Sequence, residues 1–439
     1  MIAALSFALK LPVVWRSAPG ICSCAPFVLA FCAAACSAQA QAISGALQSA
    51  EELQAAGKLP EAIAAYQQAL KHNPRNETAE LGLADAYRKV HNIEEARAAL
   101  QRARRHHPQS AAVLTATADL EIEAQSYGKA ITALRGAFAL APGDLRVRNL
   151  LASAYLSKGE TELAQAQLNK VLAKDPENAP AHFLRAQVYA AQNENEKALV
   201  DAESVFAAQP GNPRGRTLLA RILVQLKLCE RAAILLRPEA NPPQLDTETL
   251  FLLGSAYRCA GQTELAKKAR DEFAMASEAD RKRTEDQVQS KHYVEQANEL
   301  AVKGHFTEAL GLLQRGLERN PQNGFAYSQQ AKIYFSMHEL EQARQAITEA
   351  LAIQPYQPDF LYVLGIIEES AGNLDVALSA LGEVTQINPK ESDAYFEIGK
   401  IHAKRGENAK ALAAFRTAVE LAPDDPDYKK ALAEAAKHR

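Results

Sequence analysis

The chain has 439 residues, of which 48% are hydrophobic and only 6% aromatic. A formal net charge of −3 with 23% charged residues describes a surface of mixed sign, which argues against nucleic-acid binding. The alanine-rich sequence lacks the alternating Val, Ile and Thr pattern of strands, so we expect an all-α fold.

Residues 1–42 have the order of a secretory signal peptide. Two basic residues and no acidic one precede an apolar stretch at 21–35, and the small residues that follow include A-x-A sequences ending at Ala40 and Ala42. The apolar stretch is shorter than the about 20 residues of a membrane-spanning helix. We therefore expect cleavage and export to the periplasm or the medium, with no stable membrane span after processing.

Two alternatives to cleavage stay open for this leader. The segment could be retained as an anchor, or it could be a lipoprotein signal, because Cys36 follows three alanines. Lipoprotein signals usually carry Leu three residues before the cysteine, where this chain has Ala33. Lipid anchoring through Cys36 is therefore kept as the alternative localisation.

A period of 34 residues runs through the rest of the chain. It is marked by two series of prolines, Pro74, Pro108, Pro142, Pro176 and Pro210, then Pro321, Pro355, Pro389 and Pro423. Alanine stands twelve residues before each proline, and another small residue stands twelve before that. A large residue usually follows three positions later, with exceptions at Glu121, Glu368 and His402. Each period predicts two amphipathic helices that pack closely at their small residues.

This pattern resembles the tetratricopeptide repeat over residues 43–425, although the tryptophan common in its first helix is missing. The resemblance implies a right-handed superhelical solenoid of antiparallel helix pairs, with about eleven units. The units begin at Ile43, Glu77, Ala111, Leu145, Ala179, Pro213, Thr247, Ser290, Gly324, Pro358 and Ser392. Residues 426–439 are predicted to form a capping helix with a polar outer face.

Nine residues at 281–289 interrupt the register. They divide the chain into an N-terminal array of seven units at 43–280 and a C-terminal array of four units at 290–425. The segment 262–303 contains neither Gly nor Pro. We therefore expect the second helix of the seventh unit to extend well beyond its usual length, and fusion with the eighth unit stays open.

Cys229 and Cys259 are the only cysteines outside the leader. In the repeat frame they lie near the start of one second helix and the end of the next first helix, which are neighbours in a stacked array. We take two separate buried thiols as the first interpretation and a disulfide as the second.

No catalytic residue, metal site or cofactor is predicted. Phosphate-binding loops, nucleophile elbows, H-E-x-x-H and dinucleotide fingerprints are all absent from the sequence. The Lys and Asn pattern with which some family members clamp acidic chain termini is also absent. We therefore predict a non-catalytic scaffold or adaptor of the cell envelope that binds a protein or peptide. The alternatives are an assembly or export factor for envelope polysaccharide or surface appendages, and an enzyme with an unrecognised site.

The resemblance also implies where a partner binds. In such arrays, positions 2, 5, 9 and 12 of the first helices line the concave face. In the C-terminal array they include apolar rings beside charged residues, namely Phe325, Lys332, Phe335, Asp359, Tyr362, Ile366, Phe396 and Lys400. We expect these side chains to form a partner-binding groove. The alternative is that the rings only pack between adjacent units.

Overall fold

A computed structural model describes residues 47–237 and 245–437 as helices joined by short turns. A helix over 47–55 comes first. The helices that follow are α3 Leu59–His72, α4 Glu77–Lys89, α5 Ile93–His106, α6 Ala111–Glu123, α7 Tyr127–Leu140, α8 Leu145–Ser157, α9 Thr161–Leu172, α10 Ala179–Ala191, α11 Asn195–Ala208, α12 Pro213–Gln225, α13 Cys229–Leu236, α14 Thr247–Cys259, α15 Thr263–Val302, α16 Phe306–Arg319, α17 Gly324–Ser336, α18 Leu340–Ile353, α19 Pro358–Ser370, α20 Leu374–Ile387, α21 Ser392–Lys404, α22 Asn408–Leu421 and α23 Pro426–Lys437. The predicted signal peptide and Cys36 lie outside the described residues.

The all-α prediction is confirmed, and the helix boundaries follow the repeat. Many first helices begin after a residue whose side chain accepts a hydrogen bond from a backbone N–H of the first turn, as Asn76 does from Ala79. The fifteenth residue of every unit has a positive φ and ends the first helix. Gly57, Gly159, Gly261, Gly304, Gly372 and Gly406 adopt it in six units, and His91, Gln125, Asn193, Lys227 and His338 in five.

The small residues let the two helices of a unit approach closely. A Cβ atom added at Gly399 would lie 2.6 Å from the ring of Phe415, and one added at Gly365 would lie 2.6 Å from Leu381 Cγ. Close packing of this kind leaves room for only a hydrogen atom at these positions. The period of small residues is therefore the reason that first and second helices pair as antiparallel hairpins.

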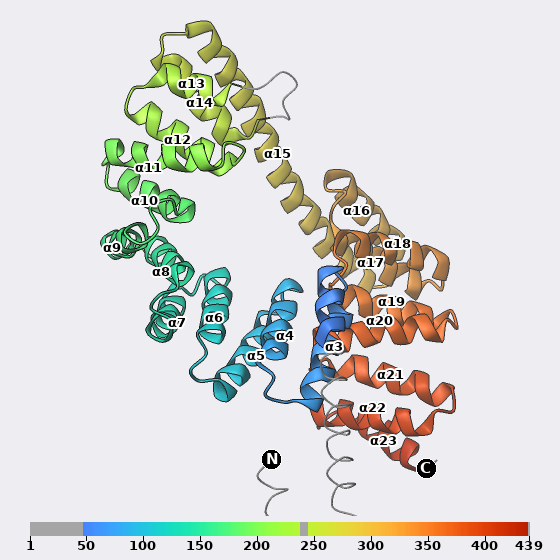
Figure 1. Cartoon of the computed structure of the whole chain (residues 1–439). Helices are drawn as coiled ribbons and strands as arrows, with labels where there is room; N and C mark the ends of the chain where they lie inside the picture. The colour runs from blue at the N-terminus through green and yellow to red at the C-terminus, as the bar shows by residue number, and fades with distance from the viewer. Residues whose placement is uncertain (1–46, 238–244, 438–439) are drawn as a thin grey trace, which may run out of the picture.

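One helix joins the two arrays. α15 runs for 40 residues without a break, from the second helix of the seventh unit through 281–289 and into the eighth unit. Its length is about 60 Å at 1.5 Å per residue. Figure 1 shows it as the straight connection between the arch formed by α4–α14 and the stack formed by α16–α23. The second helix of the seventh unit therefore extends through the insertion and is continuous with the first helix of the eighth unit.

The sixth unit departs from the expected helix pair. Its second helix, α13, has only 8 residues and ends at Leu236, whereas most second helices have 12 to 14. Pro238 follows in the sequence, and the residue before a proline is pushed out of the helical region. Arg237 accordingly has φ −56° and ψ 127°.

The two ends of the array meet, which the repeat did not predict. α3, from the first unit, packs against α20, from the tenth (Figure 1). Asn92 Nδ2 donates a hydrogen bond to the Ile387 carbonyl over 2.7 Å, and Lys390 Nζ lies 2.6 Å from a Glu95 carboxylate oxygen. Buried side chains of both ends belong to one apolar cluster. The arch and the stack therefore form a closed ring.

Candidate partner-binding groove

Five of the predicted groove residues surround one cavity between α17 and α19. The cavity has a volume of about 370 Å³. Its lining consists of Lys332, Phe335, Ser336, Asp359, Tyr362, Val363, Ile366 and Ile367. The predicted positions 9 and 12 of one first helix thus lie opposite positions 2, 5 and 9 of the next, as the helical spacing requires.

The cavity has an apolar floor and a charged rim. Val363 and Ile367 are buried, while Phe335, Tyr362 and Ile366 are partly exposed. Lys332 and Asp359 are exposed, and neither forms an ion pair with another described residue. The site therefore offers apolar contacts within reach of one unpaired cation and one unpaired anion.

The hydroxyl of Tyr362 stays protonated at neutral pH. Burial is the main reason that its pKa lies above the ordinary value of a tyrosine, and the nearby Glu397 and Asp393 carboxylates raise it further. A neutral phenol can donate one hydrogen bond and accept others, while its ring contributes apolar surface. Tyr362 can therefore contact both the backbone and the side chains of a polypeptide.

The structure places Phe325, Phe396 and Lys400 outside this cavity. Phe325 packs edge-on against Phe360 at 5.2 Å between ring centroids. Phe396 stacks on Tyr428 of α23 at 4.7 Å, and its ring lies 5.7 Å from that of Phe415. Lys400 Nζ lies 2.5 Å from a Glu397 carboxylate oxygen. The contacts of Phe396 therefore agree with the alternative interpretation, in which the ring packs between adjacent elements and does not line a partner-binding groove.

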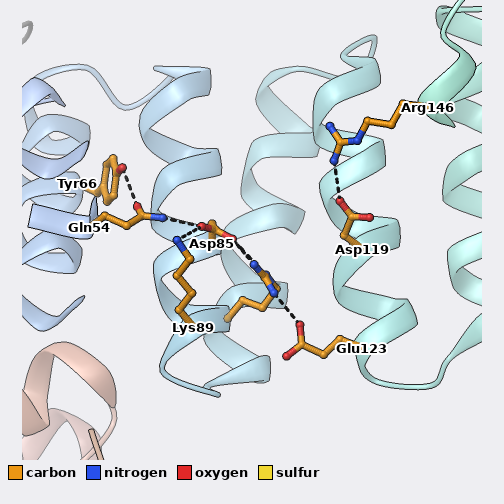
Figure 2. Close-up of polar contacts among 8 residues, drawn as sticks. Gln54, Tyr66, Asp85, Lys89, Asp119, Glu123 and Arg146 are labelled. Atoms are coloured by element: carbon orange, nitrogen blue, oxygen red, sulfur yellow. Dashed lines mark hydrogen bonds and ion pairs between the residues drawn. The ribbon is translucent and has the colours of Figure 1, made fainter. Parts of the chain in front are cut away.

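The first helices of the N-terminal array carry polar side chains instead. Figure 2 shows the chain of contacts: Gln54 donates a hydrogen bond to Asp85 over 2.6 Å, Arg88 pairs with the same carboxylate at 2.6 Å, and Arg88 also reaches Glu123 at 3.0 Å. Burial raises the pKa of Asp85, but hydrogen bonds from Arg88 and Lys89 outweigh it and hold the pKa below its ordinary value. These charges are satisfied within the protein.

The glutamates that interrupt the pattern of large residues have a structural role. Glu121 is buried and accepts a hydrogen bond from Arg97 over 2.8 Å, and Glu368 is buried and accepts one from Arg344 over 2.5 Å. Both pairs join position 21 of one unit to position 11 of the next. The arginine hydrogen bond, which outweighs burial, lowers the pKa of each carboxyl. These exceptions are visible in the sequence, but it does not identify their arginine partners, which lie 24 residues earlier in each case.

Cys229 and Cys259 form a disulfide in the structure, with their Cα atoms 5.6 Å apart. The expected neighbourhood of the two helix ends is therefore present. The bond joins the short helix α13 to the end of α14. The structure therefore contains the disulfide, which was the second of the two interpretations of these cysteines. That the bond forms in the protein in solution stays a prediction.

Within 47–237 and 245–437, no helix has both the length and the apolar character needed to cross a membrane. Over the same ranges, no group of three or more His, Cys, Asp or Glu side chains is arranged to hold a metal ion.

The sequence and the structure were compared with those of known proteins. No curated protein matches the chain. The crystal structure of the APC/C hetero-tetramer Cut9-Hcn1 contains a chain with 14% sequence identity, and the match covers 89% of both chains with a TM-score of 0.32. We draw nothing about function from a likeness at this TM-score.

Two family models described as tetratricopeptide repeat match the sequence. One covers residues 53–120, 121–188, 157–222 and 370–435, and the other covers 294–358 and 328–388. The matched segments lie in both arrays and together span more than half of the 439 residues. With helix hairpins repeating every 34 residues in the structure, these matches show that the chain belongs to the tetratricopeptide repeat family.

Proposed function

We propose that this protein is a non-catalytic scaffold of the cell envelope that binds a polypeptide segment in the groove between α17 and α19. Repeats of this family generally mediate interactions between proteins. The observation that supports this particular groove is the combination of an apolar floor with two unpaired charges at its rim. An apolar side chain of the segment fits between Phe335, Tyr362 and Ile366, while its polar groups meet Lys332 and Asp359.

The proposed location follows from the leader at 1–42. A chain that is exported and then released meets its partners outside the cytoplasm. Cell fractionation and the intact mass of the exported protein test this part: a mature chain that begins near Gln41 or Ile43 is expected, and a lipid on Cys36 would contradict it.

Photo-crosslinking in the native cells tests the groove. A photoreactive phenylalanine analogue replaces Phe335 at the groove, and in the control it replaces Val376, which is 49% exposed on α20. We expect a single polypeptide to be crosslinked from position 335 and not from 376. Purification of a glycan with the protein would instead favour the assembly factor for envelope polysaccharide.

A substitution separates binding from packing. Tyr362→Ala is expected to weaken capture of the crosslinked polypeptide about tenfold, because truncating a central aromatic contact costs more than 1 kcal/mol. The melting temperature should change little, because Tyr362 is only partly buried. Phe396→Ala is the matched control, since its ring is stacked on Tyr428. A Tyr362→Ala protein that is clearly destabilised and still captures the polypeptide would show that this groove assignment is wrong.

A further inference from the structure

The seventh unit differs from the others on the face that receives the next unit. Position 24 carries a buried apolar side chain in every other unit, namely Tyr66, Leu100, Leu134, Leu168, Ala202, Leu236, Leu313, Ile347, Leu381 and Phe415. In the seventh unit this position is Arg270, which is exposed. Position 27 is otherwise a small or β-branched buried residue where the structure describes it, and here it is Phe273, which is partly exposed.

The cause lies in α15. In a regular array the chain turns after each second helix, and the next first helix packs back onto the preceding unit, as α8 packs against α7. At the seventh unit there is no turn. The first helix of the eighth unit is the continuation of α15 itself, so it cannot fold back onto α14. Within residues 47–237 and 245–437, the face formed by α14 and the first part of α15 therefore lacks the helix that covers it in the other units (Figure 1).

In the eleventh unit, at the end of the C-terminal array, a helix covers the face that is exposed in the seventh unit. There α23 packs on α22, and its Tyr428 stacks on Phe396, the residue at position 5 of the last unit. Position 5 of the seventh unit is Phe251, whose exposed fraction is 57%. The same surface of the repeat thus accepts a single amphipathic helix at one end of the protein and stands open in the middle.

The open face is an apolar hollow with a positively charged border. Its cavity has a volume of about 410 Å³ and is lined by Leu250, Phe251, Gly254, Ser255, Arg258, Thr263, Ala266, Lys267, Arg270 and Phe273. The rings of Phe251 and Phe273 lie 5.8 Å apart. Three of the lining residues are cations and none is an anion. Arg258 and Lys267 form no ion pair with another described residue.

Adaptation to solvent alone does not explain these residues. An end face that only meets water would replace its apolar positions by polar ones, and Arg270 fits that description. Phe273 does not, because it adds a large ring where the repeat needs a small residue. Aromatic rings beside unpaired cations are instead the composition of a surface that buries a partner of opposite charge.

We propose that this face binds an amphipathic helix of a partner protein, which carries an apolar ridge flanked by aspartate or glutamate. The helix takes the place that the first helix of the next unit occupies elsewhere in the array. Its apolar residues cover Phe251 and Phe273, and its carboxylates meet Arg258, Lys267 and Arg270. This site is separate from the groove between α17 and α19.

A peptide of defined chemistry tests the proposal on the full-length mature protein. The probe is a fluorescent helical peptide based on α23, lengthened with strong helix formers and with Lys429 and Lys430 of the template replaced by glutamate. Its counterpart has lysine at every acidic position. We expect the acidic peptide to bind and the basic peptide to bind at least about tenfold more weakly, with the difference shrinking as salt is added.

Matched variants locate the binding. Phe273→Ala and Arg270→Glu should each weaken the acidic peptide about tenfold. Met275→Ala and Lys268→Glu are the controls, because both residues are exposed on the same helix and neither lines the cavity. The circular dichroism spectrum and melting temperature of each variant establish that it is folded.

Three results would overturn the proposal. Equal binding of the acidic and basic peptides would remove the role of charge, and unchanged binding by both site variants would remove the site. A photoreactive analogue at Phe251 that crosslinks within its own chain would show that a segment of this protein covers the face. A dimer in sedimentation that Phe273→Ala dissociates would identify a second copy as the occupant.

Discussion

The seventh and the eleventh unit have the same helix-pair architecture, but they differ in the face that receives the next helix. This face is covered in the eleventh unit and exposed in the seventh. In the eleventh unit, Phe415 is buried and Phe396 lies under Tyr428 of the capping helix. In the seventh, Arg270 and Phe251 occupy the corresponding positions and both are exposed. In these two units, the aromatic residue at position 5 is therefore packed under a helix where one follows, and exposed where none does. The neighbour, and not the repeat position, decides its role.

The largest expected difference between the two units is in stability. Phe415→Ala should lower the free energy of unfolding by about 4 kcal/mol, because it removes a ring from a closely packed site. Phe273→Ala should lower it by less than about 1 kcal/mol, since its ring is already in contact with water. Urea unfolding followed by circular dichroism measures both. Equal losses would mean that the two faces are equally buried and that the comparison fails.

The disulfide is expected to stabilise the seventh unit where α14 meets α13 of the sixth unit. The bond closes a segment in which the cysteines are 30 residues apart, and a loop of this length is stabilising by about 3 kcal/mol. Reduction should therefore lower the stability of α13 and α14, which hydrogen exchange measures, and leave α22 unaffected. The Cys229→Ser, Cys259→Ser double variant should reproduce the effect and no longer respond to reductant. Two free thiols in the unfolded, unreduced protein would contradict the bond.

The smallest expected difference concerns pH, because both arrays contain the same buried pair. Arginine lowers the pKa of Glu121 in one array and of Glu368 in the other, so each pair stabilises the folded state above the unfolded pKa of about 4.3. The contribution is lost as the pH falls below this value through the folded pKa.

Acid should therefore weaken the two arrays alike. The matched variants Glu121→Gln and Glu368→Gln should each reduce the loss of stability between pH 5 and pH 3 in their own array. Hydrogen exchange across the two arrays reads out the result. A response confined to one array would show that the two pairs are not equivalent.

The period in the sequence predicted the helices well because it acts locally. Small residues at fixed positions specify how a helix meets its neighbours, and the absence of Gly and Pro predicted that α15 continues. Arg270 and Phe273 could also have been found, since they break a column of apolar and small residues that is visible in the sequence. Their significance depends on α15 leading the next first helix away, which became clear only in the structure.

The groove was predicted only in part, for a related reason. Lys332, Phe335, Tyr362 and Ile366 were placed by repeat position alone, and they line one cavity. Phe396 has the same kind of position, but Tyr428 covers it from an element outside the repeat frame. The contact of α3 with α20 was not predictable, because it depends on small rotations accumulated over many units and on the direction of α15.

The contact between α3 and α20 changes how the protein unfolds. A linear array frays from both ends, because each terminal unit has a single neighbour. Here α3 of the first unit packs against α20, and Asn92 of the second unit donates a hydrogen bond to Ile387, which lies 295 residues later. Fraying at this end must therefore break these contacts as well. The stiffness of α15 limits the loop entropy lost when these contacts form. The first unit therefore unfolds only when the C-terminal stack releases it.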